Sequence, residues 1–119
     1  FGRGEDSRRV REDRGSKSVS SETTLMTDTG DLAELTAVVE RLANRVAERL
    51  QKYELEGKRI TLKLKTTDFD ILSRSQTLEG HTAEPRVLFS VAQRLLAAEV
   101  AREPLQTYRL LGIGVAGFD

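Results

Sequence analysis

The chain has 119 residues, of which 38% are hydrophobic and 32% are charged. This length allows one domain with a modest core and is too short for a catalytic domain together with a separate binding domain. The 19 basic and 19 acidic residues give a formal net charge of zero, so any attraction for nucleic acid must depend on how the charges are distributed. Cysteine is absent, which excludes disulfides and thiolate metal sites and fits a cytoplasmic location.

No apolar run approaches the ~20 residues that a membrane span requires, and the charged amino end carries no apolar signal core. We therefore expect a soluble protein without a membrane partner. Residues 1–16 alternate charged residues with glycine, and only Phe1 and Val10 are large and apolar. This composition predicts a linker or tail.

A strand is predicted where the composition changes at Lys17. Residues 17–25 are rich in serine and threonine, which favour an extended conformation on a half-buried surface. Alternate side chains share one face of this strand: Val19, Ser21, Thr23 and Leu25.

A long amphipathic helix follows this strand. Residues 27–31 contain several side chains that can cap a helix amino terminus. Apolar residues then recur every three or four positions and form one stripe: Leu32, Leu35, Val39, Leu42, Val46 and Leu50. Gly57 marks the break beyond the helix, so we predict a helix over residues 31–53.

The segment from Lys58 to Lys65 alternates strictly between apolar and polar residues, which predicts a half-buried strand. Its apolar face carries Ile60, Leu62 and Leu64. Its opposite face is mostly basic and carries four residues: Arg59, Thr61, Lys63 and Lys65.

A turn at residues 66–68 leads into a predicted strand over residues 69–78. Ile71 and Leu72 are adjacent here, and neighbouring side chains cannot both face the core of a regular strand. We therefore predict a β-bulge near them. Residues 80–82 are predicted to close the hairpin.

A second helix and a last strand complete the chain. Pro85 suits a helix start, and apolar residues at helical spacing continue to about Arg102, before Pro104. In the strand over residues 108–118, one face is apolar and the other almost bare. Leu111, Ile113 and Val115 alternate with the small residues Gly112, Gly114 and Ala116. Glycine weakens a strand, so this alternation indicates that another backbone approaches closely.

The predicted order is βαββαβ, and the fold class is α+β. Two amphipathic helices must bury their apolar stripes, and the apolar faces of four strands can cover them. We therefore expect a two-layer sandwich, in which two helices lie on one face of a four-stranded, mostly antiparallel sheet.

The uncovered sheet face combines cations, hydroxyl groups and glycines, which suits the phosphates of a duplex held without base reading. A polar face that is merely solvated remains an alternative. So do an RNA-binding module, which would stack bases on aromatic residues of the sheet, and a ferredoxin-like protein-interaction or dimerisation domain.

Catalytic and metal-binding interpretations are less favoured. His81 is the single histidine and lies in a predicted hairpin, which does not suit a structural metal site. Asp68 and Asp70 are typical turn residues, and no helix follows Gly112 and Gly114 to complete a phosphate loop. We expect no catalytic residue and no metal ligand, so the chain as it stands is not expected to be an enzyme.

Three segments and the spacing between them resemble the Y-family DNA polymerases of the polymerase IV (DinB-like) branch. They are residues 13–25, residues 60–78 and residues 108–118, separated by two helices of suitable length. Ser20 replaces a glycine that is common in the family, and Gln76 replaces a frequent basic residue. The resemblance implies that residues 1–16 are the linker from a preceding thumb domain. It also implies that residues 17–119 are the DNA-binding little finger domain, whose fold is a reversed ferredoxin-like one.

The resemblance further implies a function in lesion bypass. Such a domain binds double-stranded primer-template DNA with its strands in the major groove, and the parent can also contact a sliding clamp. The polymerase carboxylates and their magnesium belong to the palm, which no part of this sequence matches, so no cofactor is expected here. The fragment is expected to be monomeric. The implied DNA contacts are Lys17, Ser18, Ser20, Lys63, Lys65, Ser73, Arg74, Ser75 and Gln76.

Overall fold

The computed structural model describes residues 18–118, so the expected linker over residues 1–16 and the expected contact Lys17 lie outside the described residues. Six elements follow one another in the predicted βαββαβ order. They are β1 (Ser18–Thr29), α1 (Leu32–Lys52), β2 (Gly57–Thr66), β3 (Ile71–Thr82), α2 (Pro85–Arg102) and β4 (Tyr108–Ala116).

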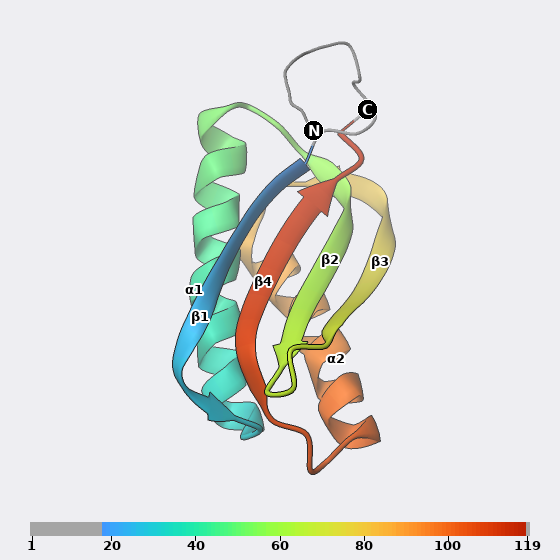
Figure 1. The fold of residues 1–119 in the computed structure, drawn as a ribbon. Coiled ribbons are helices and arrows are strands. Elements are labelled where there is room, and N and C mark those ends of the chain that lie inside the picture. Colours follow the sequence, from blue (N-terminus) through green and yellow to red (C-terminus); the bar gives the residue numbers. More distant parts are fainter. Residues whose placement is uncertain (1–17, 119) are drawn as a thin grey trace, which may run out of the picture.

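The four strands form one sheet in the order β1-β4-β2-β3, and every neighbouring pair is antiparallel. Both helices lie on the same side of the sheet, which leaves the side facing the viewer in Figure 1 uncovered. Helix α1 contacts β1 and β4, whereas α2 contacts β2 and β3. The expected two-layer α+β sandwich is therefore confirmed.

The core lies between the sheet and the helices. The apolar faces predicted for β2 and β4 are both buried there: Ile60, Leu62, Leu64, Leu111, Ile113 and Val115. The apolar stripe of α1 packs onto them, because its buried residues recur at the spacing of one helix face. Neither helix in residues 18–118 is long and apolar enough to cross a membrane.

Local side-chain contacts fix where α1 begins and how it meets the sheet. The Asp31 side chain caps the helix by accepting a hydrogen bond from the Ala33 amide at 3.2 Å. Near the other end, Arg49 Nη1 donates to the Ser20 carbonyl at 2.6 Å. This bond occupies one of the backbone groups that edge strand β1 would otherwise expose.

The predicted β-bulge near Ile71 and Leu72 is wrong. The register of β2 with β3 is continuous from Lys65 and Ile71 to Arg59 and Thr77, and the irregularity lies beyond, between Gly57 and Arg59. Leu72 packs against the core, while Ile71 is simply 59% exposed. An apolar side chain at a strand end can face solvent, so no bulge is required. Strand β3 also continues to Thr82, through the residues expected to form a turn.

Candidate nucleic-acid interface

The side chains of the uncovered face form rows across the sheet, because the central parts of the four strands pair in continuous register. Register partners form rows that cross from β1 through β4 and β2 to β3. One row consists of Ser20, Gly114, Thr61 and Ser75. The adjacent row consists of Glu22, Gly112, Lys63 and Ser73. Hydroxyl groups therefore flank Gly114, whereas Gly112 lies between a carboxylate and a cation.

Two glycines of β4, Gly112 and Gly114, form a strip without side chains, which we call the glycine strip. A Cβ at Gly114 would lie 3.5 Å from the Ser20 Cβ, which is ordinary contact. A Cβ at Gly112 would lie 3.0 Å from the Glu22 Cβ, which is tight. Space within the fold thus accounts for Gly112, which is buried, but does not require Gly114, whose partly exposed backbone a ligand from outside could approach.

The cations of β2 differ in whether a carboxylate pairs with them. Lys63 Nζ lies 3.2 Å from Glu22 Oε1, and this ion pair passes over Gly112, which has no side chain to obstruct it. Arg59 and Lys65 form no ion pair with a carboxylate in the described range 18–118. Lys63 is therefore partly neutralised, whereas no carboxylate of residues 18–118 neutralises Arg59 or Lys65.

A cluster of two cations and one aromatic ring lies at the β2–β3 turn. The Arg109 Cζ is 4.3 Å from the centroid of the Phe69 ring, and the Lys65 Nζ is 5.2 Å from it. Phe69 is 60% exposed. The sequence had predicted only Lys65 at this end of the sheet.

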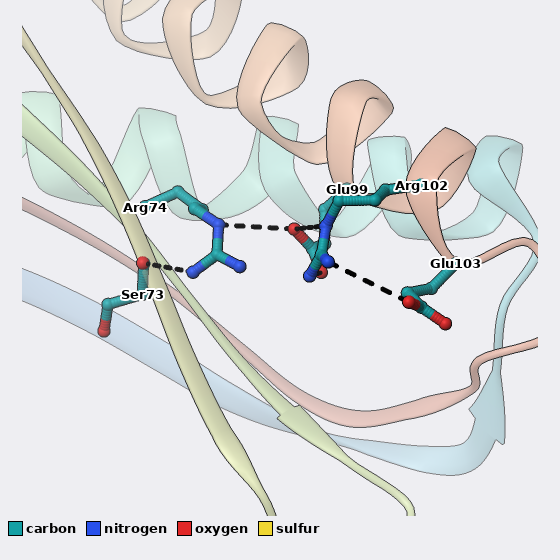
Figure 2. Close-up of polar contacts among 5 residues, drawn as sticks. All are labelled: Ser73, Arg74, Glu99, Arg102 and Glu103. Atoms are coloured by element: carbon teal, nitrogen blue, oxygen red, sulfur yellow. Dashed lines mark hydrogen bonds and ion pairs between the residues drawn. The ribbon is translucent and has the colours of Figure 1, made fainter.

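Two of the predicted DNA contacts on β3 face the helices instead. The burial of β3 alternates, with Ser73 and Ser75 exposed and Arg74 and Gln76 on the opposite side. Arg74 Nε lies 3.3 Å from Glu99 Oε1 on α2, as Figure 2 shows. Arg74 and Gln76 therefore lie on the helix side of the sheet, because successive side chains of a strand point to opposite faces.

Glu99 is the centre of this polar network between β3 and α2. Its carboxylate is only 3% exposed and also pairs with Arg102 Nη2 at 2.8 Å, as drawn in Figure 2. Two guanidinium groups satisfy the buried charge, which would otherwise be costly to desolvate. The hydrogen bond and charge of Glu99 raise the pKa of Arg102 above its ordinary value. Arg74 thus stabilises the layer contact rather than offering a free cation.

Tyr108 lies near the same network at the start of β4. Its hydroxyl is buried and has no hydrogen-bond partner among residues 18–118. Burial, followed by the charges of Glu99 and Glu103, raises the pKa of this phenol above its ordinary value. The side chain acts mainly as an apolar core residue, whose polar end is not satisfied.

A family model described as the impB/mucB/samB family C-terminal domain matches residues 16–119. The chain belongs to this family. The DNA polymerase IV 1 of Mesorhizobium japonicum is 42% identical over 114 residues, which cover 96% of this chain and 25% of that protein. The chain therefore spans about a quarter of the length of this curated relative.

Two solved structures share the fold of this impB/mucB/samB domain. A Y-family DNA polymerase chimera matches with a TM-score of 0.77 and 21% identity, covering 94% of this chain and 30% of the other. The little finger domain of PolIV, solved in complex with the beta-clamp processivity factor, matches with a TM-score of 0.70 and 25% identity. This match covers 87% of this chain and 90% of the other. The predicted resemblance to the Y-family little finger is confirmed.

In this impB/mucB/samB domain, six of the nine predicted contacts share the uncovered face: Ser18, Ser20, Lys63, Lys65, Ser73 and Ser75. Sequence reasoning did not identify Glu22 as the partner of Lys63, because the pairing depends on register across β4. It also missed Arg109 and Phe69. The approach of Arg109 to Phe69 follows a register shift between Lys65 and Thr66 that no sequence signal announces.

No group of three or more histidine, cysteine, aspartate or glutamate side chains that could hold a metal ion occurs in the part of the chain the structure describes. The uncovered face presents cations, hydroxyls and backbone amides together with the carboxylate of Glu22. Cations, hydroxyls and backbone amides hold phosphate oxygens and fix the position of a nucleic-acid backbone.

Proposed function

We propose that this chain is the little finger domain of a lesion-bypass DNA polymerase of the polymerase IV type. In this proposal its uncovered sheet face binds the backbone of double-stranded primer-template DNA without reading sequence. The observation that carries the proposal is Gly114, a partly exposed position without a side chain, between the hydroxyl residues Ser20 and Thr61 and near the cations of β2. A strip without side chains lets a second backbone come close, while the flanking groups supply hydrogen bonds and charge.

The membership of the impB/mucB/samB family and the relative named DNA polymerase IV 1 support this proposal. We infer that residues 1–16 link the domain to a preceding thumb and that residues 17–119 form the binding domain. Lys17 is proposed as a further contact at the start of the domain. The domain itself carries no catalytic residue in this proposal, and the parent chain supplies the polymerase activity with magnesium held in its palm.

A sliding clamp is a second proposed partner of the parent chain. The support is the structural similarity to the little finger domain of PolIV that was solved in complex with the beta-clamp processivity factor. We propose that the parent acts in the cytoplasm and that the domain binds DNA as a single copy.

The first prediction concerns how salt affects duplex binding. Fluorescence anisotropy of a labelled primer-template duplex, titrated with the chain over a series of salt concentrations, should give an affinity that falls linearly on logarithmic axes. Replacing both Lys63→Ala and Lys65→Ala should reduce the steepness of this line by up to about 1.8, because each lost phosphate contact accounts for about 0.9.

The matched control removes two cations from the helix layer. Arg41→Ala with Arg45→Ala changes the net charge equally, but both residues are exposed on α1, away from the uncovered face. This variant should retain most of the affinity and its salt dependence. An affinity that does not change with salt, or equal losses in both double variants, would contradict a phosphate contact by the sheet.

A further inference from the structure

The cluster of Lys65, Phe69 and Arg109 has a geometry that strand pairing alone does not explain. Phe69 has a φ of 70°, in the left-handed region where bulky side chains are rare. Its amide donates to the Thr66 carbonyl at 2.9 Å, which closes a tight turn. Glycine or asparagine is usual at such a left-handed turn position. An exposed phenylalanine held there against its conformational preference suggests a role for the ring.

Arg109 reaches this ring through an irregularity of β4. Lys65 pairs with Leu110 and Thr66 pairs with Tyr108, so Arg109 is the extra residue between two registered pairs. A bulge of this kind redirects a side chain. Here the guanidinium lies over Phe69, within reach of the same ring as the ammonium of Lys65.

Two cations gathered on one ring repel each other and favour an anion that both can contact. Neither Lys65 nor Arg109 forms an ion pair with a carboxylate within residues 18–118, so their charges are not already neutralised there. The face of an aromatic ring attracts cations and limits their movement. A guanidinium and an ammonium that contact the same ring are close enough to a common site to suit the oxygens of one phosphate group.

We propose that Phe69 is a positioning residue, which holds Arg109 and Lys65 as a two-cation site for one phosphate of the bound nucleic-acid backbone. This inference rests on the proposed function and adds Arg109 and Phe69 to the contacts of the sheet face. The site lies at the β2–β3 turn, at the end of β4 opposite Ala116 (Figure 1).

The test uses the 119-residue chain and the labelled primer-template duplex in a salt series. Arg109→Gln should weaken binding and reduce the salt dependence by about 0.9, the loss of one phosphate contact. Phe69→Leu keeps both charges but removes the ring, and it should reduce the salt dependence in the same direction. Phe69→Tyr keeps an aromatic face and should bind the duplex with the affinity and salt dependence of the unchanged chain.

A combined variant separates positioning from direct contact. In a background of Lys65→Gln and Arg109→Gln, adding Phe69→Leu should change affinity by less than about twofold, since the ring then has no cation to hold. A further loss in that background would overturn the proposal, because Phe69 would then contact the nucleic acid itself. Thermal melting of each variant checks that it folds. If Arg109→Gln does not fold, the salt dependence of Phe69→Leu provides the test.

Two failures are distinguishable. If the unchanged chain binds the duplex in a salt-dependent way and Arg109→Gln has the same dependence, the two-cation site is refuted while the proposed function stands. If the unchanged chain shows no salt-dependent binding, the proposed function fails, and the two-cation site fails with it.

Discussion

At the scale of single residues, we expect the ion pair between Lys63 and Glu22 to weaken the attraction of the uncovered face for phosphate. The two atoms are 3.2 Å apart, and both side chains are substantially exposed. A carboxylate on a face proposed to meet DNA repels phosphates and occupies a cation. We therefore expect the ion pair to weaken the proposed binding of duplex DNA.

Glu22→Gln should strengthen duplex binding, because it removes a negative charge and frees Lys63. The salt dependence should become steeper by up to about 0.9 if the freed lysine gains a phosphate contact. Anisotropy titration measures both effects. Glu40→Gln removes the same charge from an exposed position on α1 and is the control. Equal effects from the two substitutions would show that only net charge matters.

Tyr108→Phe should stabilise the fold. The buried hydroxyl has no partner in residues 18–118, and an unsatisfied buried polar group costs about 1–3 kcal/mol. Since ring packing is unchanged, we expect a gain of about 1 kcal/mol in the free energy of unfolding. Tyr53→Phe, at an exposed tyrosine, is the control and should have little effect. A loss of stability in Tyr108→Phe would indicate that the hydroxyl is satisfied.

The same variant should alter the response to alkaline pH. The pKa of Tyr108 is raised in the folded protein by burial, so above a pH of about 10 the unfolded chain loses this proton first. The unfolded state then binds fewer protons than the folded state. The free energy of unfolding of the unchanged chain is therefore constant with respect to this group below that pH and decreases above it. Denaturation curves between pH 8 and about 11 should therefore diverge, with the unchanged chain losing stability faster than Tyr108→Phe.

At the scale of elements, β4 is the strand in which stability and proposed function oppose each other. Glycine within a strand is less stable than alanine by roughly 0.5–1 kcal/mol. A Cβ at Gly114 would make only ordinary contact with Ser20, so the fold itself tolerates a side chain there.

Gly114→Ala should therefore raise the free energy of unfolding by about 0.5–1 kcal/mol and weaken duplex binding several-fold, because the methyl group keeps the DNA backbone away. Thermal melting and anisotropy titration measure the two effects. Gly80→Ala, on β3 where a Cβ would meet nothing within 4 Å, is the control. It should leave binding unchanged. Retention of full affinity in Gly114→Ala would show that the glycine strip does not meet the DNA.

The sequence predicted the elements whose pattern is strictly local. Alternation in β2 and β4 assigned their faces correctly, and the apolar stripe of α1 located that helix to within a residue at each end. Strand β3 was harder because Ile71 is apolar yet exposed, which suggested a bulge and left the face of Arg74 open. Contacts that join distant strands, such as Lys63 with Glu22, depend on register and could not be read from one segment.

At the scale of the whole molecule, the two faces of the sheet have different roles. The helices and the apolar sheet face form the core, and the Glu99 network joins β3 to α2. The other sheet face is not part of this core, which leaves its hydroxyls and cations available for the proposed binding. The zero net charge of the chain is compatible with this, because Arg59, Lys63 and Lys65 still lie together on the uncovered side of β2.

The most direct test of this account is to record amide chemical shifts of the ¹⁵N-labelled chain by NMR while a primer-template duplex is added. If the duplex binds the open face of the sheet, the largest changes should occur at Gly112, Gly114, Ser73 and Ser75. Amides on the exposed side of α1, around Arg41 and Arg45, should barely change. Changes concentrated on the helices, with the sheet amides unaffected, would contradict the claim that the duplex binds the open face of the sheet.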